Sequence, residues 1–93
     1  MPATANPSAT VAVSVLYFAA LRDLAGVAEE SIVLPSTESV DVSALLTALE
    51  REHEALRGRL GSVRVAVNEE FAPLSTKLVG GEVVALIPPV SGG

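Results

Sequence analysis

Hydrophobic positions along this chain recur at two different spacings, which predict two kinds of element. Four short stretches are rich in β-branched residues and carry apolar side chains at every second position or throughout, which is typical of β-strands. They are residues 11–18 (VAVSVLYF), 30–35 (ESIVLP), 62–68 (SVRVAVN) and 83–88 (VVALIP). The first and the last have apolar residues on both faces, so we expect them to be central strands that lie side by side.

Residues 40–60 follow the other spacing: mostly apolar side chains recur at every third or fourth position, so they share one face of a helix. These are Val42, Leu45, Leu46, Leu49, His53, Leu56 and Leu60. We predict one amphipathic helix that begins after Asp41 as N-cap and ends at Gly58 or Gly61. A shorter helical turn is predicted over residues 19–26, with Gly26 in the C-cap position.

The predicted order is strand, strand, helix, strand, strand. If the terminal strands pair in parallel, the helix belongs to a right-handed crossover and covers one face of a mixed sheet of four to five strands. That α+β arrangement is the β-grasp, or ubiquitin-like, fold. We expect a disordered lead-in over residues 1–10, the β-grasp domain over 11–87 and an extended tail over 88–93. In the connecting segment 69–82, Phe71 and Leu74 are expected to pack onto the core.

Composition narrows the classes of function. The chain has 93 residues, enough for one domain, and a net charge of −5, which argues against nucleic acid or an anionic membrane as the main partner. It has no cysteine, which excludes disulfides, thiolate nucleophiles and cysteine-ligated metals. The start of the chain lacks the basic residues of a signal peptide, and its longest apolar run is too short for a bilayer. We expect a cytoplasmic protein.

The tail IPPVSGG, residues 87–93, carries the candidate chemistry. Pro88 and Pro89 end sheet pairing and hold the following residues in an extended form. Gly92 and Gly93 have no side chains, so this end of the chain can enter a narrow tunnel. We expect the unhindered carboxylate of Gly93 to be open to activation as an acyl-adenylate, and sulfur placed on its carbonyl carbon would form a thiocarboxylate.

Other polar residues favour structural roles. His53 lies in the helical stripe and is expected to contact the sheet or its edge, and Glu69 and Glu70 are expected to be exposed. Phe18 is consistent with either a core position or a partner contact, whereas Arg22 is expected to face solvent or a partner, because burying an unpaired charge is costly. The chain offers no acid–base pair, metal motif or cofactor site, so we expect catalysis to be carried out by its partners.

Three motifs together resemble the small, sulfur-carrying subunit of molybdopterin synthase. They are VLYFAALRDLAG (15–26), VAVN (65–68) and GGEVVALIPPVSGG (80–93). The resemblance covers residues 11–93. It implies that a ubiquitin-activating-like adenylyltransferase uses ATP to adenylate the C-terminal glycine, which a sulfur donor system then converts to a thiocarboxylate. It further implies that the tail enters the large synthase subunit and donates sulfur to cyclic pyranopterin monophosphate, within a hetero-oligomer.

The resemblance also implies roles for single residues. Gly93 would carry the acyl group and the sulfur, and Gly92 would permit threading. The residues implied to contact the partner are Ser91, Val90, Pro89, Pro88, Ile87, Phe18 and Arg22. The chain departs from the family at Leu86 and Ile87, where many members have two aromatic residues, and at STKLVGGE (75–82), which replaces a more usual Asp-Thr-Pro-Leu-x-x-Gly-Asp pattern. We interpret the second departure as turn variation.

Three other functions fit parts of the pattern. A sulfur carrier for thiazole formation in thiamine synthesis shares the fold and the Gly-Gly end, but such proteins are generally shorter and lack LYFAALRDLAG. A ubiquitin-like modifier would use Gly93 to form isopeptide bonds with lysines of its targets. A plain interaction domain predicts instead that removing Gly92 and Gly93 changes nothing beyond local mobility.

Overall fold

The computed structural model describes residues 10–35 and 40–89, so residues 1–9 of the predicted lead-in and the last four residues of the tail lie outside the described parts, whereas Thr10, also predicted to belong to the lead-in, begins a strand. The strands are β1 (Thr10–Tyr17), β2 (Glu29–Pro35), β3 (Val40–Asp41), β4 (Arg64–Val67), β5 (Glu70–Phe71), β6 (Lys77–Leu78) and β7 (Val83–Ile87). The helices are α1 (Ala20–Ala25), α2 (Val42–Glu52) and a short 3₁₀ helix, η2 (Glu54–Leu56). The predicted strands and helices all form, with boundaries shifted at several ends.

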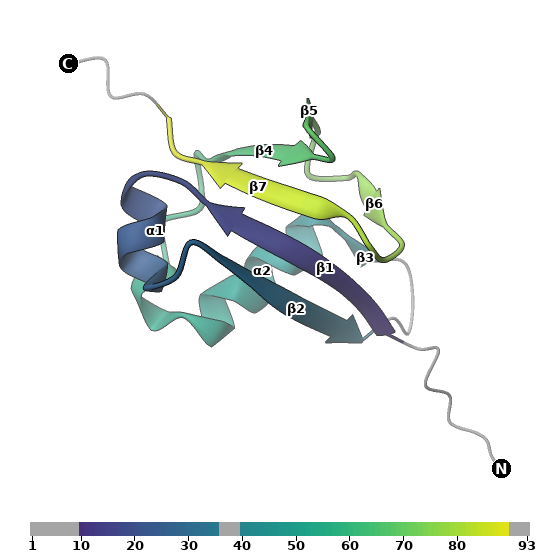
Figure 1. Cartoon of the computed structure of the whole chain (residues 1–93), viewed down its shortest axis with the longest axis horizontal. Helices are drawn as coiled ribbons and strands as arrows, with labels where there is room; N and C mark the ends of the chain where they lie inside the picture. Colours follow the sequence, from purple (N-terminus) through teal and green to yellow (C-terminus); the bar gives the residue numbers. More distant parts are fainter. Residues whose placement is uncertain (1–9, 36–39, 90–93) are drawn as a thin grey trace, which may run out of the picture.

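Within the described residues, the main sheet has five strands in the order β2-β1-β7-β4-β5, and β3 pairs with β6 in a separate pair (Figure 1). The terminal strands β1 and β7 lie parallel at the centre, in register from Ser14 opposite Val83 to Tyr17 opposite Leu86. On the two sides of this central pair, β2 is antiparallel to β1 and β4 is antiparallel to β7. Helix α2 crosses behind the sheet and covers one face (Figure 1). The predicted β-grasp architecture is therefore confirmed.

The core lies between α2 and the covered face, which we call the inner face of the sheet. The strands supply buried side chains at alternate positions, and α2 adds the stripe that the sequence predicts. The members that are almost fully excluded from solvent are Leu45, Leu49, Leu56, Leu86, Val15, Val42 and Val84. None of the helices among the described residues is long and apolar enough to cross a membrane.

Helix α2 begins as predicted but ends earlier. The side chain of Asp41 accepts a hydrogen bond from the backbone N–H of Ala44 at 2.9 Å, the geometry of an N-cap. The helix ends at Glu52, because His53 takes an extended backbone conformation, with φ −124° and ψ 101°. Leu56 and Leu60 are still buried, but the chain brings them to the core through η2 and a turn. The spacing therefore predicted the burial of both residues correctly. The prediction that they belong to one continuous α-helix was wrong, because Leu56 lies in the 3₁₀ helix and Leu60 follows it.

The side chain of His53 joins this end of the helix to the sheet. Its Nε2 lies 2.5 Å from Oε2 of Glu30 on β2, and the hydroxyl of Tyr17 donates to the same oxygen at 2.5 Å. The rings of Tyr17 and His53 also meet edge to face. Burial and the hydrogen bond to Glu30 raise the pKa of Tyr17. The cluster joins the end of α2 to β1 and β2, in agreement with the structural role predicted for His53.

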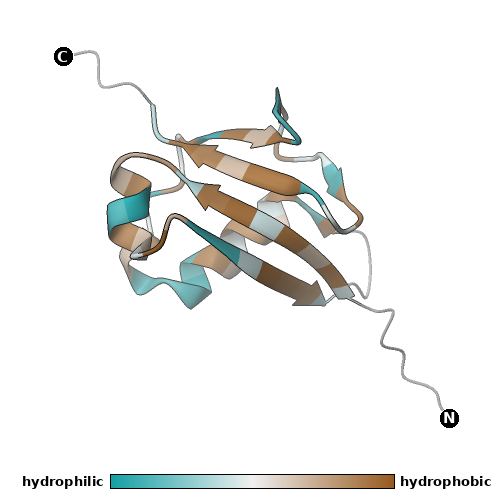
Figure 2. Ribbon diagram, in the orientation of Figure 1, coloured by the Kyte–Doolittle hydropathy of each residue, from teal (hydrophilic) through white to brown (hydrophobic). Residues whose placement is uncertain are grey.

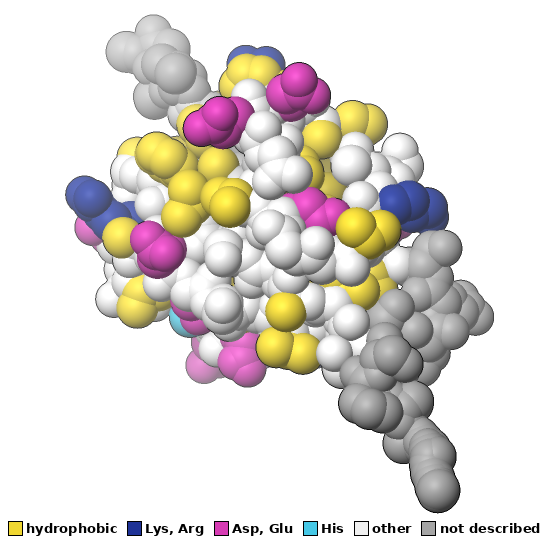
Figure 3. Space-filling view, turned by 45° about the vertical axis from the view of Figure 1, so that its right-hand side comes forward, with side chains coloured by type: hydrophobic (Ala, Val, Ile, Leu, Met, Phe, Trp, Pro, Cys, Tyr) yellow, Lys and Arg dark blue, Asp and Glu magenta, His cyan; other side chains and the backbone are white. Residues whose placement is uncertain are grey.

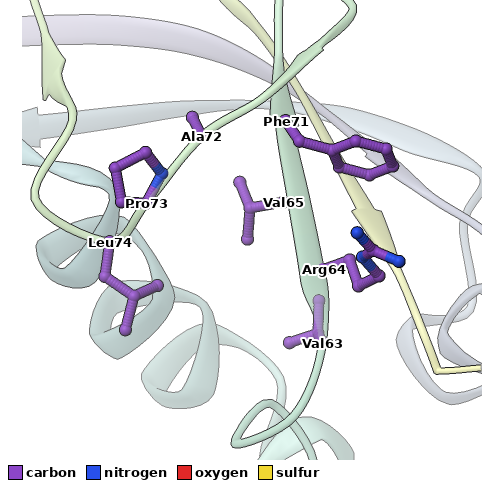
Figure 4. Close-up of a pocket in the computed structure, with 7 residues that line it drawn as sticks. All are labelled: Val63, Arg64, Val65, Phe71, Ala72, Pro73 and Leu74. Atoms are coloured by element: carbon purple, nitrogen blue, oxygen red, sulfur yellow. The ribbon is translucent and has the colours of Figure 1, made fainter.

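The connecting segment before β7 departs from prediction. Phe71 is 64% exposed and Leu74 is 51% exposed, so neither is buried in the core. Phe71 lies instead under the guanidinium of Arg64, whose central carbon is 4.4 Å from the ring centroid, a cation–π arrangement (Figure 4). The prediction was wrong because this segment forms β5 and a turn outside the covered area of the sheet.

Candidate functional site

The candidate site begins where β7 ends. Ile87, the last residue of this strand, lies opposite Arg64 of β4, and the backbone N–H of Phe18 donates to the carbonyl oxygen of Leu86 at 3.2 Å. Pro88 follows half-buried and Pro89 is exposed. The tail therefore starts between the ends of β1 and β4. The four remaining predicted site residues, Val90, Ser91, Gly92 and Gly93, lie outside the described residues.

The second face of the sheet, which we call the outer face, is apolar beside this exit, and no helix within residues 10–35 and 40–89 lies over it (Figure 1). Leu16 and Ala85 lie in register on β1 and β7, and Ala66 of β4 continues the row. A shallow hollow of about 440 Å³ lies here, lined by Leu16, Phe18, Asn68, Glu69, Val83 and Ala85. Hydrophobic side chains gather on this surface near the point where the described chain ends (Figure 3).

A sharp turn places Phe18 at the edge of this hollow. Ala19 has a φ of +52°, which is uncommon for a residue with a side chain, and it directly precedes α1. Phe18 is left 46% exposed, so of the two predicted positions, core or surface, it occupies the surface. Arg22 is exposed on α1, which ends as predicted with Gly26 in the left-handed conformation. Phe18 thus lies directly after β1 at the tail exit, and Arg22 lies on the surface of the helix that follows.

Asn68 fixes the opposite end of the hollow. Its backbone N–H donates to the carbonyl oxygen of Val83 at 2.8 Å, and its side-chain oxygen accepts from the N–H of Val83 at 3.0 Å. Asn68 and Glu69 both have positive φ and form the tight turn between β4 and β5. The asparagine of the VAVN motif therefore has a structural role, which is to hold the start of β7 against β4.

Glu82 supports the other side of the same strand start. Its carboxylate is buried and accepts hydrogen bonds from the backbone N–H groups of Val79 and Gly80, both at 2.8 Å. Burial alone would raise the pKa of Glu82, but these hydrogen bonds outweigh it and hold the pKa below its usual value. The residue thus closes the turn that leads into β7, a role that the sequence pattern did not reveal.

The structure brings together the described members of the predicted site. Ile87, Pro88, Pro89 and Phe18 lie at one end of the sheet, at the exit of the tail, and Arg22 lies on α1, the helix that follows β1 at this end. Sequence reasoning missed the apolar outer face that leads to this exit, formed chiefly by Leu16, Val83 and Ala85. The signal was available, because the first and last strands are apolar at both even and odd positions although a helix covers only one face.

Comparison with known proteins identifies the family. Residues 15–93 match the model of the ThiS family. The molybdopterin synthase sulfur carrier subunit of Mycobacterium tuberculosis is 39% identical over 83 residues, which cover 89% of this chain and 99% of the relative. The chain therefore belongs to the ThiS family of ubiquitin-like proteins and is a relative of the molybdopterin synthase sulfur carriers.

Solved structures agree on the fold. A putative molybdopterin converting factor, subunit 1, from Pyrococcus furiosus superposes with a TM-score of 0.75 and 36% identity over 86% of this chain and 99% of that chain. A complex of subunits 1 and 2 of the molybdopterin-converting factor from Helicobacter pylori contains a chain with a TM-score of 0.58 and 31% identity, covering 89% of this chain and 100% of that one. Small archaeal modifier protein 3 of Haloferax volcanii is also similar, with 32% identity over 83% of this chain and 94% of the relative.

Proposed function

We propose that this chain is the sulfur carrier of molybdopterin synthase. One structural observation carries the proposal: β7 leads directly into the Pro88–Pro89 spacer from beside an uncovered apolar face, on a chain of the ThiS family. A carrier must present its end to a partner while its body docks on the partner's surface. The exit of the tail and the apolar outer face are adjacent, as that task requires.

In this proposal the reactive group is the carboxylate of Gly93. It attacks the α-phosphorus of ATP on a ubiquitin-activating-like adenylyltransferase, which forms an acyl-adenylate and releases pyrophosphate. Sulfide-level sulfur from a donor system, written as HS⁻, then attacks the carbonyl carbon and displaces AMP, which leaves a thiocarboxylate and one released proton. ATP is bound by the activating partner, and this chain supplies only the acyl group. We assign all acid–base catalysis to the partners.

The charged carrier then docks on the large synthase subunit and donates its sulfur to cyclic pyranopterin monophosphate. The solved Helicobacter pylori complex of subunits 1 and 2 supports a large-subunit partner for a relative of this chain. We propose that Phe18, Ile87 and the adjacent apolar outer face contact this partner, with Arg22 at the margin. Burying exposed apolar area supplies affinity, and the extended tail supplies reach.

A reconstituted synthase assay tests the proposal. The wild-type chain, a variant with one alanine appended after Gly93 and the Gly92→Phe variant are each incubated with ATP, the activating enzyme and the sulfur donor, and then mixed with the large subunit and the pterin precursor. We expect sulfur transfer from wild type only, because the appended residue replaces the reactive carboxylate and phenylalanine obstructs a narrow tunnel. A Val27→Ala variant, changed at an exposed site after α1, serves as the control and is expected to react normally. Full turnover by the extended, unprocessed chain would overturn the proposal.

A protein-modifier function is the second candidate, because the small archaeal modifier protein of Haloferax volcanii is similar over most of the chain. Both functions begin with adenylation of Gly93 and differ in the nucleophile that follows. Isopeptide-linked adducts on lysines in cells, absent with Gly92 and Gly93 removed, would favour the modifier. Sulfur transfer to a thiazole-forming enzyme instead of the synthase would favour the thiamine pathway.

A further inference from the structure

The last residue of β1 and the residue after it lie on opposite faces of the sheet. Tyr17 is buried in the core at 3% exposure, whereas Phe18 is 46% exposed and lines the hollow on the outer face. The N–H of Tyr17 donates to the carbonyl oxygen of Ala28 at 2.8 Å, and that of Phe18 donates to the carbonyl oxygen of Leu86 at 3.2 Å. Because no residue separates the two side chains, the orientation of Tyr17 also constrains that of Phe18.

The turn after β1 is held to the sheet by few groups of its own. Residues 18–20 are all exposed, so Tyr17 is the last buried side chain before the turn. Ala19, at the N-cap of α1, makes no side-chain capping hydrogen bond. The N–H groups of Leu21 and Arg22 donate back into the turn, to the carbonyl oxygens of Phe18 and Ala19, both at 3.0 Å. The side chain of Tyr17 therefore anchors this end of β1 from the inner face.

Three elements meet at the hydroxyl of Tyr17. It donates to Oε2 of Glu30 on β2 at 2.5 Å, and Nε2 of His53, at the end of α2, lies 2.5 Å from the same oxygen. The rings of Tyr17 and His53 also meet edge to face, with centroids 5.9 Å apart and an interplanar angle of 82°. The side chains of His53 and Glu30 are only 20% and 24% exposed, so water competes weakly for these hydrogen bonds.

Burial of the ring does not require this hydroxyl. Phenylalanine would fill nearly the same space, and a buried hydroxyl costs free energy unless it is hydrogen-bonded. Burial, followed by the hydrogen bond to Glu30, raises the pKa of Tyr17, so the hydroxyl stays protonated and remains a donor. A satisfied polar network inside a protein favours one arrangement of the side chains that it joins. The network thus restricts the orientation of Tyr17.

We propose that Glu30 and His53 are positioning residues, which act through the hydroxyl of Tyr17 to hold Phe18 in the orientation that docks on the large synthase subunit. In the proposed function, on which this inference rests, Phe18 contacts that subunit. A side chain that is already held in its bound orientation loses less conformational freedom on binding, so its contact contributes more affinity. Tyr17 faces the core and affects binding only through Phe18.

Amide hydrogen exchange tests the first step on the full chain, without a partner. Tyr17→Phe removes the hydroxyl and keeps the ring. We expect exchange at the Phe18 amide to accelerate at least about threefold relative to exchange at Ser14, whose N–H donates to the carbonyl oxygen of Glu82 within the same strand. Equal acceleration at both amides would show a loss of global stability alone. That result, or an unchanged rate at Phe18, would overturn the proposal.

Variants of the two positioning residues supply matched pairs for the same measurement. Glu30→Gln keeps an oxygen that can accept both hydrogen bonds and is expected to retain the wild-type rate at Phe18 within about twofold. Glu30→Ala removes that oxygen and is expected to behave like Tyr17→Phe. His53→Phe keeps an aromatic ring but loses the N–H, and is expected to accelerate exchange at Phe18 as well. Identical rates for Glu30→Gln and Glu30→Ala would contradict a role for the hydrogen bonds.

A double-mutant cycle tests the second step with the large synthase subunit. Titration calorimetry is expected to show that Tyr17→Phe weakens binding about threefold in the presence of Phe18 and has no further effect in the Phe18→Ala chain. Val84→Ala, a core variant outside the network, is the control for lost stability and is expected to bind like wild type.

The outcomes of this cycle separate the inference from the function on which it rests. Equal weakening by Tyr17→Phe in both backgrounds, a similar loss for Val84→Ala, or an unchanged affinity for Tyr17→Phe would overturn the positioning role alone. Absence of binding by the wild-type chain would contradict the proposed function and the positioning role together.

Discussion

Both faces of the central sheet carry apolar residues, but one face packs into the core and the other lies at the surface. The inner face packs under α2 and contains almost all of the core. The outer face carries apolar residues as well, but none of the helices in the described part of the chain covers it near the tail exit (Figure 1). Figure 2 shows that β1 and β7 are hydrophobic along most of their length. One set of apolar residues stabilises the fold, and we interpret the other as a docking surface.

Strand β7 contains both sets in five residues. Val84 and Leu86 point into the core and are fully excluded from solvent. Val83 is 39% exposed, and Ala85 and Ile87 are partly exposed. An exposed apolar side chain contributes little to stability, because unfolding removes it from few contacts. The comparison predicts that substitutions on the inner face act on folding and substitutions on the outer face act on binding.

The largest expected effect comes from a matched pair of valines on β7. Val84→Ala is expected to lower the free energy of unfolding by about 2 kcal/mol, because it removes two buried methyl groups and leaves a cavity. Val83→Ala is expected to lower it by less than about 0.5 kcal/mol. Urea denaturation followed by circular dichroism measures both. Equal losses for the two variants would contradict the division between the faces.

A substitution of Phe18 tests whether the outer face contributes to binding. Phe18→Ala is expected to weaken binding to the large synthase subunit about tenfold, or about 1.4 kcal/mol, while the unfolding free energy changes less. Phe71→Ala, at the other phenylalanine of the chain, is the matched control and is expected to change affinity less than about twofold. Titration calorimetry measures the affinities. An undiminished affinity for Phe18→Ala would move the docking surface elsewhere.

The smallest expected effect concerns Glu82, at the end of β7 far from the tail. Because its pKa is lowered in the folded chain, its contribution to stability is present above the usual glutamate pKa of about 4.3 and is lost as the pH falls through the folded value. Glu82→Gln is expected to cost about 1 kcal/mol at neutral pH and less in acid. Unfolding measured across the acid range checks this. A cost that is independent of pH would show that the carboxylate charge is not involved.

Much of the fold was predictable from local patterns. Alternation and β-branched residues identified the main strands, and Asp41 and Gly26 identified a helix start and a helix end through their capping geometry. The end of α2 at Glu52 was not predictable from spacing, because the apolar stripe continues to Leu60, and the contact of His53 with Glu30, 23 residues away in the sequence, exists only in the folded chain. The exposure of Phe71 was missed for a similar reason, since its contact with Arg64 exists only once β4 and β5 pair.

The candidate site, too, was predictable only in part. The end of sheet pairing before Pro88 was predictable, because proline has no backbone N–H and a restricted φ regardless of its surroundings, whereas the predicted glycine end lies outside the described residues. The sequence showed apolar residues on both faces of β1 and β7 and a single long helix to cover them, but it did not show which face that helix would cover. Only the path of the chain through α2 decides which face of β1 and β7 stays open.

Intact mass spectrometry tests the central claim most directly. The full chain is incubated with ATP, a ubiquitin-activating-like adenylyltransferase and a sulfur donor, and fragmentation then locates any change. Our account predicts a gain equal to the exchange of one oxygen for one sulfur, located on Gly93 and absent when ATP is omitted. An unchanged mass with an adenylyltransferase that is active on a related carrier, or a sulfur located elsewhere in the chain, would contradict it.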